Sequence, residues 1–195
     1  MTKARHSAGD ELGAQAHLIA AQPLEAHAAG NPGDSLGELC KVAAGYFMLG
    51  GHASAERWYG LVLALDPNLA VSYQNLAAIH AERGEVAQAQ TCRERAYGIQ
   101  RVFIESAGAP ERRLLILCAG HASRNVPFET MLSGGESCRI KYVIDFAAEE
   151  EDAQLPPFDL VFNAIGEPDV AASLAARLAR FVVRCERPVL NFLPP

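Results

Sequence analysis

Several features that identify common protein classes are missing from this chain of 195 residues. No apolar run approaches the ~20 residues of a membrane-spanning helix, and the first residues, MTKARHSAGDELG, lack the apolar core of a secretory signal. Lysine and arginine number 17 against 23 aspartates and glutamates, and the net charge of −6 provides no electrostatic footprint for nucleic acid. We therefore expect a cytoplasmic protein that binds neither nucleic acid nor a membrane.

Motifs for metal binding and phosphate binding are also missing. The five cysteines are widely spaced and form no C-x-x-C, which argues against structural zinc and a disulfide framework. Neither a G-x-G-x-x-G nor a G-x-x-x-x-G-K-[ST] phosphate loop occurs. Cys118 and His121 form one C-x-x-H, but Cys118 ends an apolar run and is interpreted as a small buried hydrophobe. The sequence predicts no catalytic residue, no metal site and no required cofactor.

The first half of the chain contains a repeat with a period of about 34 residues. One unit covers residues 36–69 and the next covers residues 70–103. The pairs that align across this offset are Gly50 with Gly84, Ala55 with Ala89, and Val62 with Ala96. Small residues let paired helices approach closely, and glycine adopts a positive φ in turns at little cost. We therefore predict two helical hairpins with turns at the two glycines.

These positions resemble the pattern of the tetratricopeptide repeat (TPR) family. The matching residues are Leu39, Val42, Ala43, Tyr46, Ala55, Tyr59, Val62 and Pro67 in the first unit, and Tyr73, Leu76, Ala77, Gly84, Ala89 and Ala96 in the second. In the first unit, Leu39 stands in place of the usual tryptophan and Val62 in place of alanine. The second unit departs from the pattern at His80, Arg93 and Arg101, where the family has two aromatics and a proline. The resemblance implies an array of paired helices whose concave surface holds a protein or peptide.

The predicted array covers residues 11–105 and follows a flexible N-terminus at residues 1–10. A helix at residues 11–29 would precede the two repeats. The polar candidates for the concave face are Gln74, Asn75, His80 and Arg83, with ordinary solvated helix positions as the alternative. Trp58 is either an exposed anchor or, as we favour, a packing residue between repeats. About three repeats are usually needed for a free-standing array, so we expect support from the second half of the chain or a homodimer.

The second half has the pattern of an α/β domain, predicted over residues 111–195. A continuous apolar run at residues 114–118 predicts a strand buried on both faces. Further strands are expected at residues 140–145, 159–163 and 188–191, with helices towards residue 132 and over residues 169–185. The acidic run at residues 149–152 is a solvated loop or a helix start. Strands alternating with helices predict a small four-stranded parallel sheet.

Polar residues follow several of the predicted strands. They are His121, Ser123, Arg124, Asn125, Asn163, Glu167 and Asn191. Ligands of parallel sheets bind beyond the carboxyl ends of the strands, so these residues predict a ligand crevice. The alternative is that they cap loops and helices, as Asn125 would do before Val126 and Pro127.

This half also resembles the Rossmann-like leading domain of ATP-grasp proteins that carry tetratricopeptide repeats. The resemblance covers residues 112–195 and rests, in order, on LLILCAG, NVPFE, FDLVFNAIGEPD and RPVLN. It implies a Rossmann-like fold without catalytic residues, and crevice contributions from Asn125, Asn163, Glu167 and Asn191. In that family a larger region with the ATP-binding lysines and Mg²⁺ carboxylates follows. ATP–Mg²⁺ is therefore implied only together with such a core, and we expect this chain to be a fragment or to have lost it.

Three functions follow from these patterns. The leading one is a binding or scaffold protein in which TPR helices hold a protein or peptide and the Rossmann-like domain supports them. The alternative is the non-catalytic leading part of an ATP-grasp ligase whose core is not in this chain. The third is a small-molecule sensor in which a ligand shifts the angle between the two halves.

Overall fold

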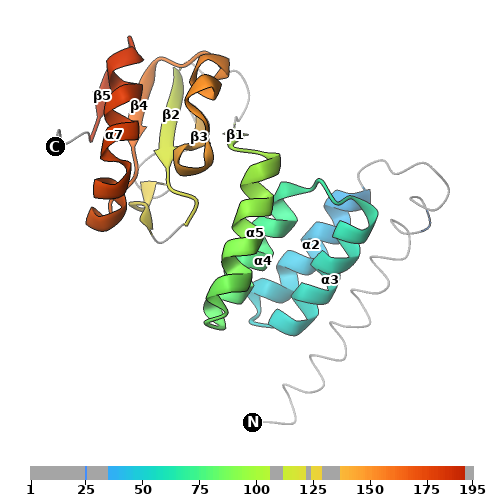
Figure 1. The fold of residues 1–195 in the computed structure, drawn as a ribbon. Helices are drawn as coiled ribbons and strands as arrows, with labels where there is room; N and C mark the ends of the chain where they lie inside the picture. Colours follow the sequence, from blue (N-terminus) through green and yellow to red (C-terminus); the bar gives the residue numbers. More distant parts are fainter. Residues whose placement is uncertain (1–24, 26–34, 106–111, 122–123, 129–136, 192–195) are drawn as a thin grey trace. The chain divides into compact units, whose positions relative to one another are not determined.

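The computed structural model describes residues 25, 35–105, 112–121, 124–128 and 137–191. These belong to two compact units, here called the helical unit (residues 1–96) and the sheet unit (residues 97–195). Helices precede the sheet, a further helix lies between its last two strands, and the chain is of the α+β class (Figure 1). The predicted N-terminal segment, the helix at residues 11–29 and most of the helical stretch towards residue 132 lie outside the described residues.

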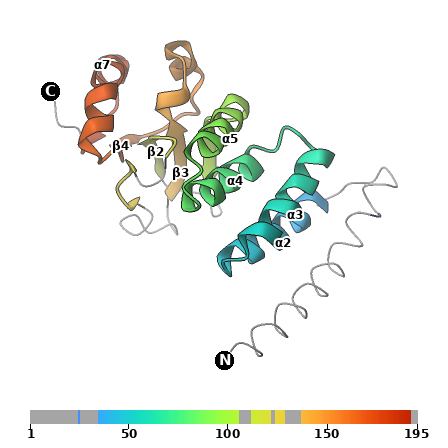
Figure 2. The same cartoon turned by 60° about the horizontal axis from the view of Figure 1, so that its bottom comes forward.

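The helical unit is built from two hairpins whose helices lie side by side (Figures 1 and 2). Their helices are α2 (Ser35–Met48), α3 (His52–Leu65), α4 (Ala70–Glu82) and α5 (Val86–Ile99), of which the end of α5 belongs to the sheet unit. The second helices, α3 and α5, both have 14 residues and begin 34 residues apart. Gly50 and Gly84 have φ angles of 74° and 75°, which confirms the predicted turns.

Small and aromatic residues at the repeat positions form the core of the helical unit. Ala55, Tyr59 and Val62 of α3 are fully buried, and Ala89 of α5 is 1 % exposed. Trp58 is 8 % exposed and packs in the same core, so the packing interpretation is confirmed and the exposed anchor was wrong. The small side chains allow close approach, while the aromatic rings fill the space between helices.

The sheet has five strands in the order β1-β3-β2-β4-β5. They are β1 (Val102–Glu105), β2 (Arg112–Cys118), β3 (Ser137–Val143), β4 (Leu160–Asn163) and β5 (Val189–Leu190). The four predicted strands run parallel to one another, but β1 pairs antiparallel with β3. The predicted four-stranded parallel sheet was therefore wrong: the sheet is mixed, because the Val-Phe-Ile run at the end of the second repeat forms a strand rather than a helix end.

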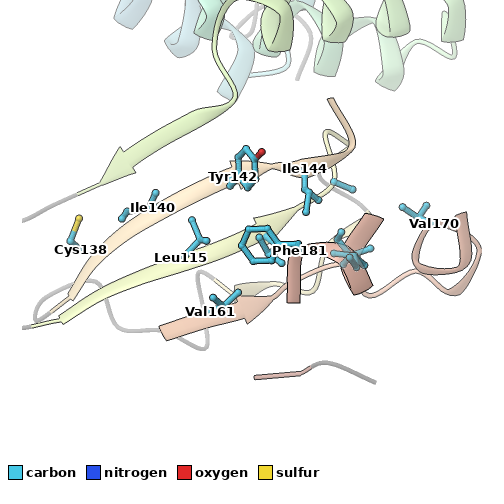
Figure 3. Packing of buried hydrophobic residues seen from close by; sticks show 12 residues of the cluster. Leu115, Cys138, Ile140, Tyr142, Ile144, Val161, Val170 and Phe181 are labelled. Atoms are coloured by element: carbon cyan, nitrogen blue, oxygen red, sulfur yellow. The ribbon is translucent and has the colours of Figure 1, made fainter. Parts of the chain in front are cut away.

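Both faces of the central strand β2 are buried, as its continuous apolar run predicts. Leu115 and Leu117 pack on one face in a cluster that includes Phe181 of helix α7 (Pro168–Arg184). Figure 3 shows Leu115 of β2 and Val161 of β4 beside Phe181. The residues on the other face include Leu114, Ile116 and Cys118, which pack with Phe128 and Phe162. The interpretation of Cys118 as a buried hydrophobe is confirmed.

Strand β3 ends earlier than its sequence suggests. Residues 144 and 145, predicted as the end of the strand, belong to a short 3₁₀ helix, η2 (Ile144–Phe146). The acidic run begins a second one, η3 (Glu149–Gln154), which confirms the helix start.

A network of charged side chains joins η3 to α7. Arg177 of α7 donates two hydrogen bonds to Asp152 of η3, and the Tyr142 hydroxyl donates to the same carboxylate at 2.8 Å. The side chains of Arg177 and Asp152 are only 11 % and 12 % exposed. Arg184 contacts both Asp152 and Glu149, and Arg180 pairs with Glu149. Two elements distant in sequence are thereby fixed on one face of the sheet.

Candidate functional site

The sheet contains a point where the order of its parallel strands reverses. The strand that follows β2 in the chain, β3, lies on one side of it, and β4 lies on the other. The loops that leave β2 and β4 therefore flank the position at which open α/β sheets bind ligands, beyond the carboxyl ends of the strands. We define these loops as the β2 loop (residues 119–126) and the β4 loop (residues 164–167), which contain most of the predicted crevice residues.

The two loops are hydrogen-bonded to each other through their backbones. The amide of Val126 donates to the Ala164 carbonyl at 2.7 Å, and the amide of Gly166 donates to the Arg124 carbonyl at 3.0 Å. Asn125 and Ile165 form an isolated antiparallel bridge. A Cβ at Gly166 would lie 2.7 Å from Cγ1 of Val126, so glycine permits this close approach. The two loops are therefore joined where residues 124–126 meet residues 164–166.

The side chain of Asn125 hydrogen-bonds to the backbone at the start of its own loop. Its Oδ1 accepts a hydrogen bond from the Ala119 amide at 2.7 Å, and its Nδ2 donates to the carbonyls of Ala119 and His121 at 2.8 and 3.3 Å. Both ends of the side-chain amide are thus used by backbone groups that have no ladder partner. This geometry favours the loop-stabilising alternative for Asn125.

Asn163 and Asn191 form a second such arrangement, at the ends of β4 and β5. Asn163 is 7 % exposed; its Nδ2 donates to the Asn191 carbonyl at 3.3 Å and its Oδ1 accepts from the Ile165 amide at 3.2 Å. The Nδ2 of Asn191 donates to the Asn163 carbonyl at 2.8 Å. Asn191 has a φ of 54°, a left-handed conformation that asparagine tolerates better than most residues. These two asparagines also stabilise backbone.

Asp145, one residue into η2, is the residue at this edge that the sequence analysis missed. Both of its carboxylate oxygens accept the Gly120 amide, at 3.0 and 3.1 Å. Burial raises the pKa of Asp145 above its usual range, while the Gly120 hydrogen bond and the Arg124 charge act in the opposite direction. The signal in the sequence was an acid after a predicted apolar strand, but the strand was expected to extend to residue 145.

The Gly120 peptide is held on its other side by Tyr97. The Tyr97 hydroxyl donates to the Gly120 carbonyl at 2.9 Å, and its ring lies 4.9 Å from that of Phe146. A Cβ at Gly120 would lie 2.6 Å from Phe146 and 2.7 Å from Tyr97. The space that a glycine leaves open for a phosphate in nucleotide-binding loops is therefore filled here by aromatic rings.

The remaining crevice candidates differ from the asparagines. Arg124 and Glu167 are about half exposed, and their charged groups lie 3.7 Å apart. His121 is half-buried at the start of the same loop, and Ser123 lies outside the described residues. Arg124 and Glu167 are therefore the predicted residues whose charged groups a ligand at this edge could reach.

The polar candidates of the helical unit also fall into two groups. His80 contacts Glu85 at 2.6 Å across the α4–α5 turn, and Arg83 donates to Glu56 of α3 at 2.6 Å. These two residues stabilise the array itself. Gln74 and Asn75 are half-buried on α4, and within the described part of the chain their side chains have no hydrogen-bond partner.

One motif match escaped the sequence analysis. Residues 33–37 read G-D-S-L-G, the G-x-S-x-G pattern that places a nucleophilic serine between a strand and a helix. Ser35 is the first residue of α2, and every described strand lies C-terminal to residue 101. Within the described residues no strand leads into Ser35, and we assign it no catalytic role.

Comparison with known proteins adds no identification: no family model, curated protein or solved structure matches the chain. Among the described residues, no group of three or more histidine, cysteine, aspartate or glutamate side chains could hold a metal ion. None of the described helices is long and apolar enough to cross a membrane.

Proposed function

We propose that this protein is a TPR-type scaffold whose helical unit binds a protein or an extended peptide. The observation that carries the proposal is the repeated hairpin: α3 and α5 start 34 residues apart, and each is preceded by a glycine of nearly identical φ. Helical arrays of this kind recognise partners through surfaces formed by several helices together.

The binding surface that we propose is centred on Gln74 and Asn75 of α4. Their amides can each donate and accept hydrogen bonds, which suits the backbone of an extended peptide. His80 and Arg83 would support this surface indirectly, because their contacts with Glu85 and Glu56 fix the α4–α5 turn and the neighbouring helix. A homodimer that covers the open end of the array is part of the proposal and would appear in light scattering.

For the sheet unit we propose a Rossmann-like domain with a supporting role. The parallel strands have the order 2-1-3-4 that is typical of doubly wound sheets. The strand-end asparagines bind loop backbone, and Gly120 packs against aromatic rings, so these groups support a stable scaffold rather than a phosphate site. We also propose a cytoplasmic location, with which the five free cysteines are compatible.

Binding of a defined peptide tests the scaffold proposal. A peptide selected from a display library against the whole chain would be titrated by fluorescence anisotropy. Replacing Gln74 and Asn75 together with alanine should weaken its binding at least ~10-fold, equivalent to ~1.4 kcal/mol. Gln88→Ala on the exposed surface of α5 is the matched control and should leave the affinity unchanged. Equal affinities for the wild type and the double variant would exclude this surface.

The second candidate function is the leading part of an ATP-grasp ligase, favoured by the exposed Arg124 and Glu167 beside the strand reversal. Calorimetry with ATP–Mg²⁺ tests it directly. Because Asn125 and Asn163 hold backbone, their substitution would disturb the loops themselves, and Arg124→Ala and Glu167→Ala are the cleaner variants. Saturable binding of ATP–Mg²⁺ that both variants weaken would support this function. Absence of binding would exclude it for this chain and leave only the scaffold proposal.

A further inference from the structure

The sheet ends on one side with β1 and on the other with β5 (Figure 1). Within the described part of the chain, each of these strands pairs with a neighbour on one side only. Strand β5 has two residues and is followed by Asn191, whose φ of 54° takes the chain out of the strand direction. Strand β1 has four residues and therefore provides the longer open edge, to which another strand can add.

The pairing of β1 with β3 determines which backbone groups of β1 point outward. In an antiparallel pair, positions that exchange both backbone hydrogen bonds alternate with positions that exchange none. The amide of Val143 donates to the Arg101 carbonyl at 2.9 Å, and the register places these two residues opposite each other. Phe103 is the next residue bonded to β3. The amides and carbonyls of Val102 and Ile104 therefore point away from the sheet.

Two observations at this edge agree with that orientation. The Nε2 of Gln100 donates to the Val102 carbonyl at 2.8 Å, so this carbonyl is accessible from outside the β1–β3 pair. Gln100 is itself exposed, and exposed side chains change rotamer rapidly. The side chain of Ile104 is 58 % exposed, so a large apolar group lies beside the outward backbone groups.

The sequence of this edge is complementary to itself. Residues 101–105 read RVFIE, and two copies that run antiparallel about Phe103 place Arg101 opposite Glu105 and Val102 opposite Ile104. The second of these pairs joins the residues whose backbone groups point outward, so it can exchange both of its hydrogen bonds. Registers centred on Val102 or Ile104 would instead place a charged residue opposite Phe103 and lose the pairing of opposite charges.

We propose that the outer edge of β1 binds a second copy of this chain, β1 against β1, in the register centred on Phe103. The two five-stranded sheets then form one continuous sheet across a two-fold axis. Opposite charges and apolar side chains that face each other directly favour this pairing of strands. Glu105 keeps its contacts with Arg139 and Lys141 inside its own chain, at 3.0 and 2.8 Å, and these also keep β1 on β3.

This contact is separate from the dimer proposed at the open end of the helical array. All of its residues belong to the sheet unit, and it does not depend on peptide binding by Gln74 and Asn75. An array dimer would leave the outward amides of β1 unchanged, whereas the β1 contact bonds them directly. The two proposals can therefore fail independently.

Amide hydrogen exchange of the whole chain, measured by NMR, tests the pairing residue by residue. Samples at ~50 µM and ~1 mM cover the weak dimers expected of small interfaces. The amides of Val102 and Ile104 should exchange at least ~3-fold more slowly in the concentrated sample, because the second copy bonds them. The amide of Phe103, already bonded to β3, should change little. An Ile104 amide that exchanges equally fast in both samples would overturn the proposal.

Sedimentation equilibrium of matched variants supplies the second measurement. Ile104→Lys places a charge beside the paired edge and should weaken self-association at least ~10-fold, since lysine on an edge strand opposes pairing. Val183→Lys is the control: it adds the same charge at a β-branched residue of α7 that is 86 % exposed, and it should associate as the wild type does. Circular dichroism establishes that both variants fold. Wild-type association by Ile104→Lys, or equal losses in the two variants, would contradict the β1 contact.

Discussion

The helical unit and the sheet unit use their polar side chains in different ways. In the helical unit, His80 and Arg83 bind other side chains. The backbone amides and carbonyls of a helix are already hydrogen-bonded to one another and need no side-chain partner. In the sheet unit, Asn125 and Asn163 bind loop backbone at the ends of strands, where amides and carbonyls leave the ladder. Polar side chains thus stabilise the surface of one unit and the backbone framework of the other.

The largest expected effect concerns the charged network of the sheet unit. Asp152→Ala leaves the nearly buried guanidinium of Arg177 without its carboxylate, and we expect a loss of about 3–5 kcal/mol in the free energy of unfolding. Urea denaturation followed by circular dichroism measures it. Glu56→Ala, which breaks an ion pair on the surface of the helical unit, is the control and should cost less than about 1 kcal/mol. Similar costs for the two variants would show that burial of the Arg177–Asp152 pair does not increase its contribution to stability.

The second comparison concerns asparagines. Asn125→Ala should cost about 2–3 kcal/mol, because three backbone groups of the β2 loop lose their partner. Asn75→Ala, on a helix that needs no such partner, should change the stability by no more than about 0.5 kcal/mol. Chemical denaturation of both variants gives the difference, and a cost at Asn75 as large as at Asn125 would contradict it.

Glycine provides the third comparison. Gly120→Ala forces a methyl group against the rings of Tyr97 and Phe146 and should destabilise the chain by about 1–3 kcal/mol. Gly60→Ala places the methyl group in open space within α3 and should stabilise it by about 0.5–1 kcal/mol. Thermal unfolding should show melting-temperature shifts of opposite sign for the two variants. Two shifts of the same sign would show that Tyr97 and Phe146 can move to make room for the methyl group.

The smallest effect is a pH dependence at Asp145. Because burial raises its pKa in the folded chain, the protonated carboxyl is favoured on folding. Its contribution is present at low pH and is lost as the pH rises through the folded pKa. Asp145→Asn keeps an acceptor for the Gly120 amide without the charge. The melting temperature of the wild type should therefore fall relative to that of Asp145→Asn as the pH rises from about 4 to about 7, the range in which carboxyls with a raised pKa titrate. A gap that closes with rising pH would show that the carboxylate stabilises the fold.

Local patterns made much of the fold predictable. The hairpins follow from glycine and alanine positions that recur within one chain segment, and β2 follows from five consecutive apolar residues. Strand β1 was missed because its four residues lie at the end of a helical repeat and pair with β3, whose partner Ile140 is 36 residues from Ile104. Pairing over such distances leaves little trace in a single sequence.

The candidate site was less predictable than the fold, for a physical reason. The sequence correctly indicated that Asn163 ends a strand and that Asn125 lies in the loop after β2. It could not show that their amides bind backbone groups of nearby residues. Asp145 was missed because its role depends on the Gly120 amide, 25 residues away in the chain. A polar residue at a strand end is visible in a sequence, whereas the group that it contacts is not.

The central place of β2 in the sheet has a consequence for how the chain folds. Its register joins it to residues 137–143 on one side and to residues 160–163 on the other. Its pairing is therefore complete only after the 45 residues from 119 to 163 have followed it from the ribosome. Until then its apolar run Leu114–Leu115–Ile116–Leu117 has open edges that other chains can pair with. The hairpins close over much shorter loops and should form first. Aggregation during synthesis should therefore begin at β2.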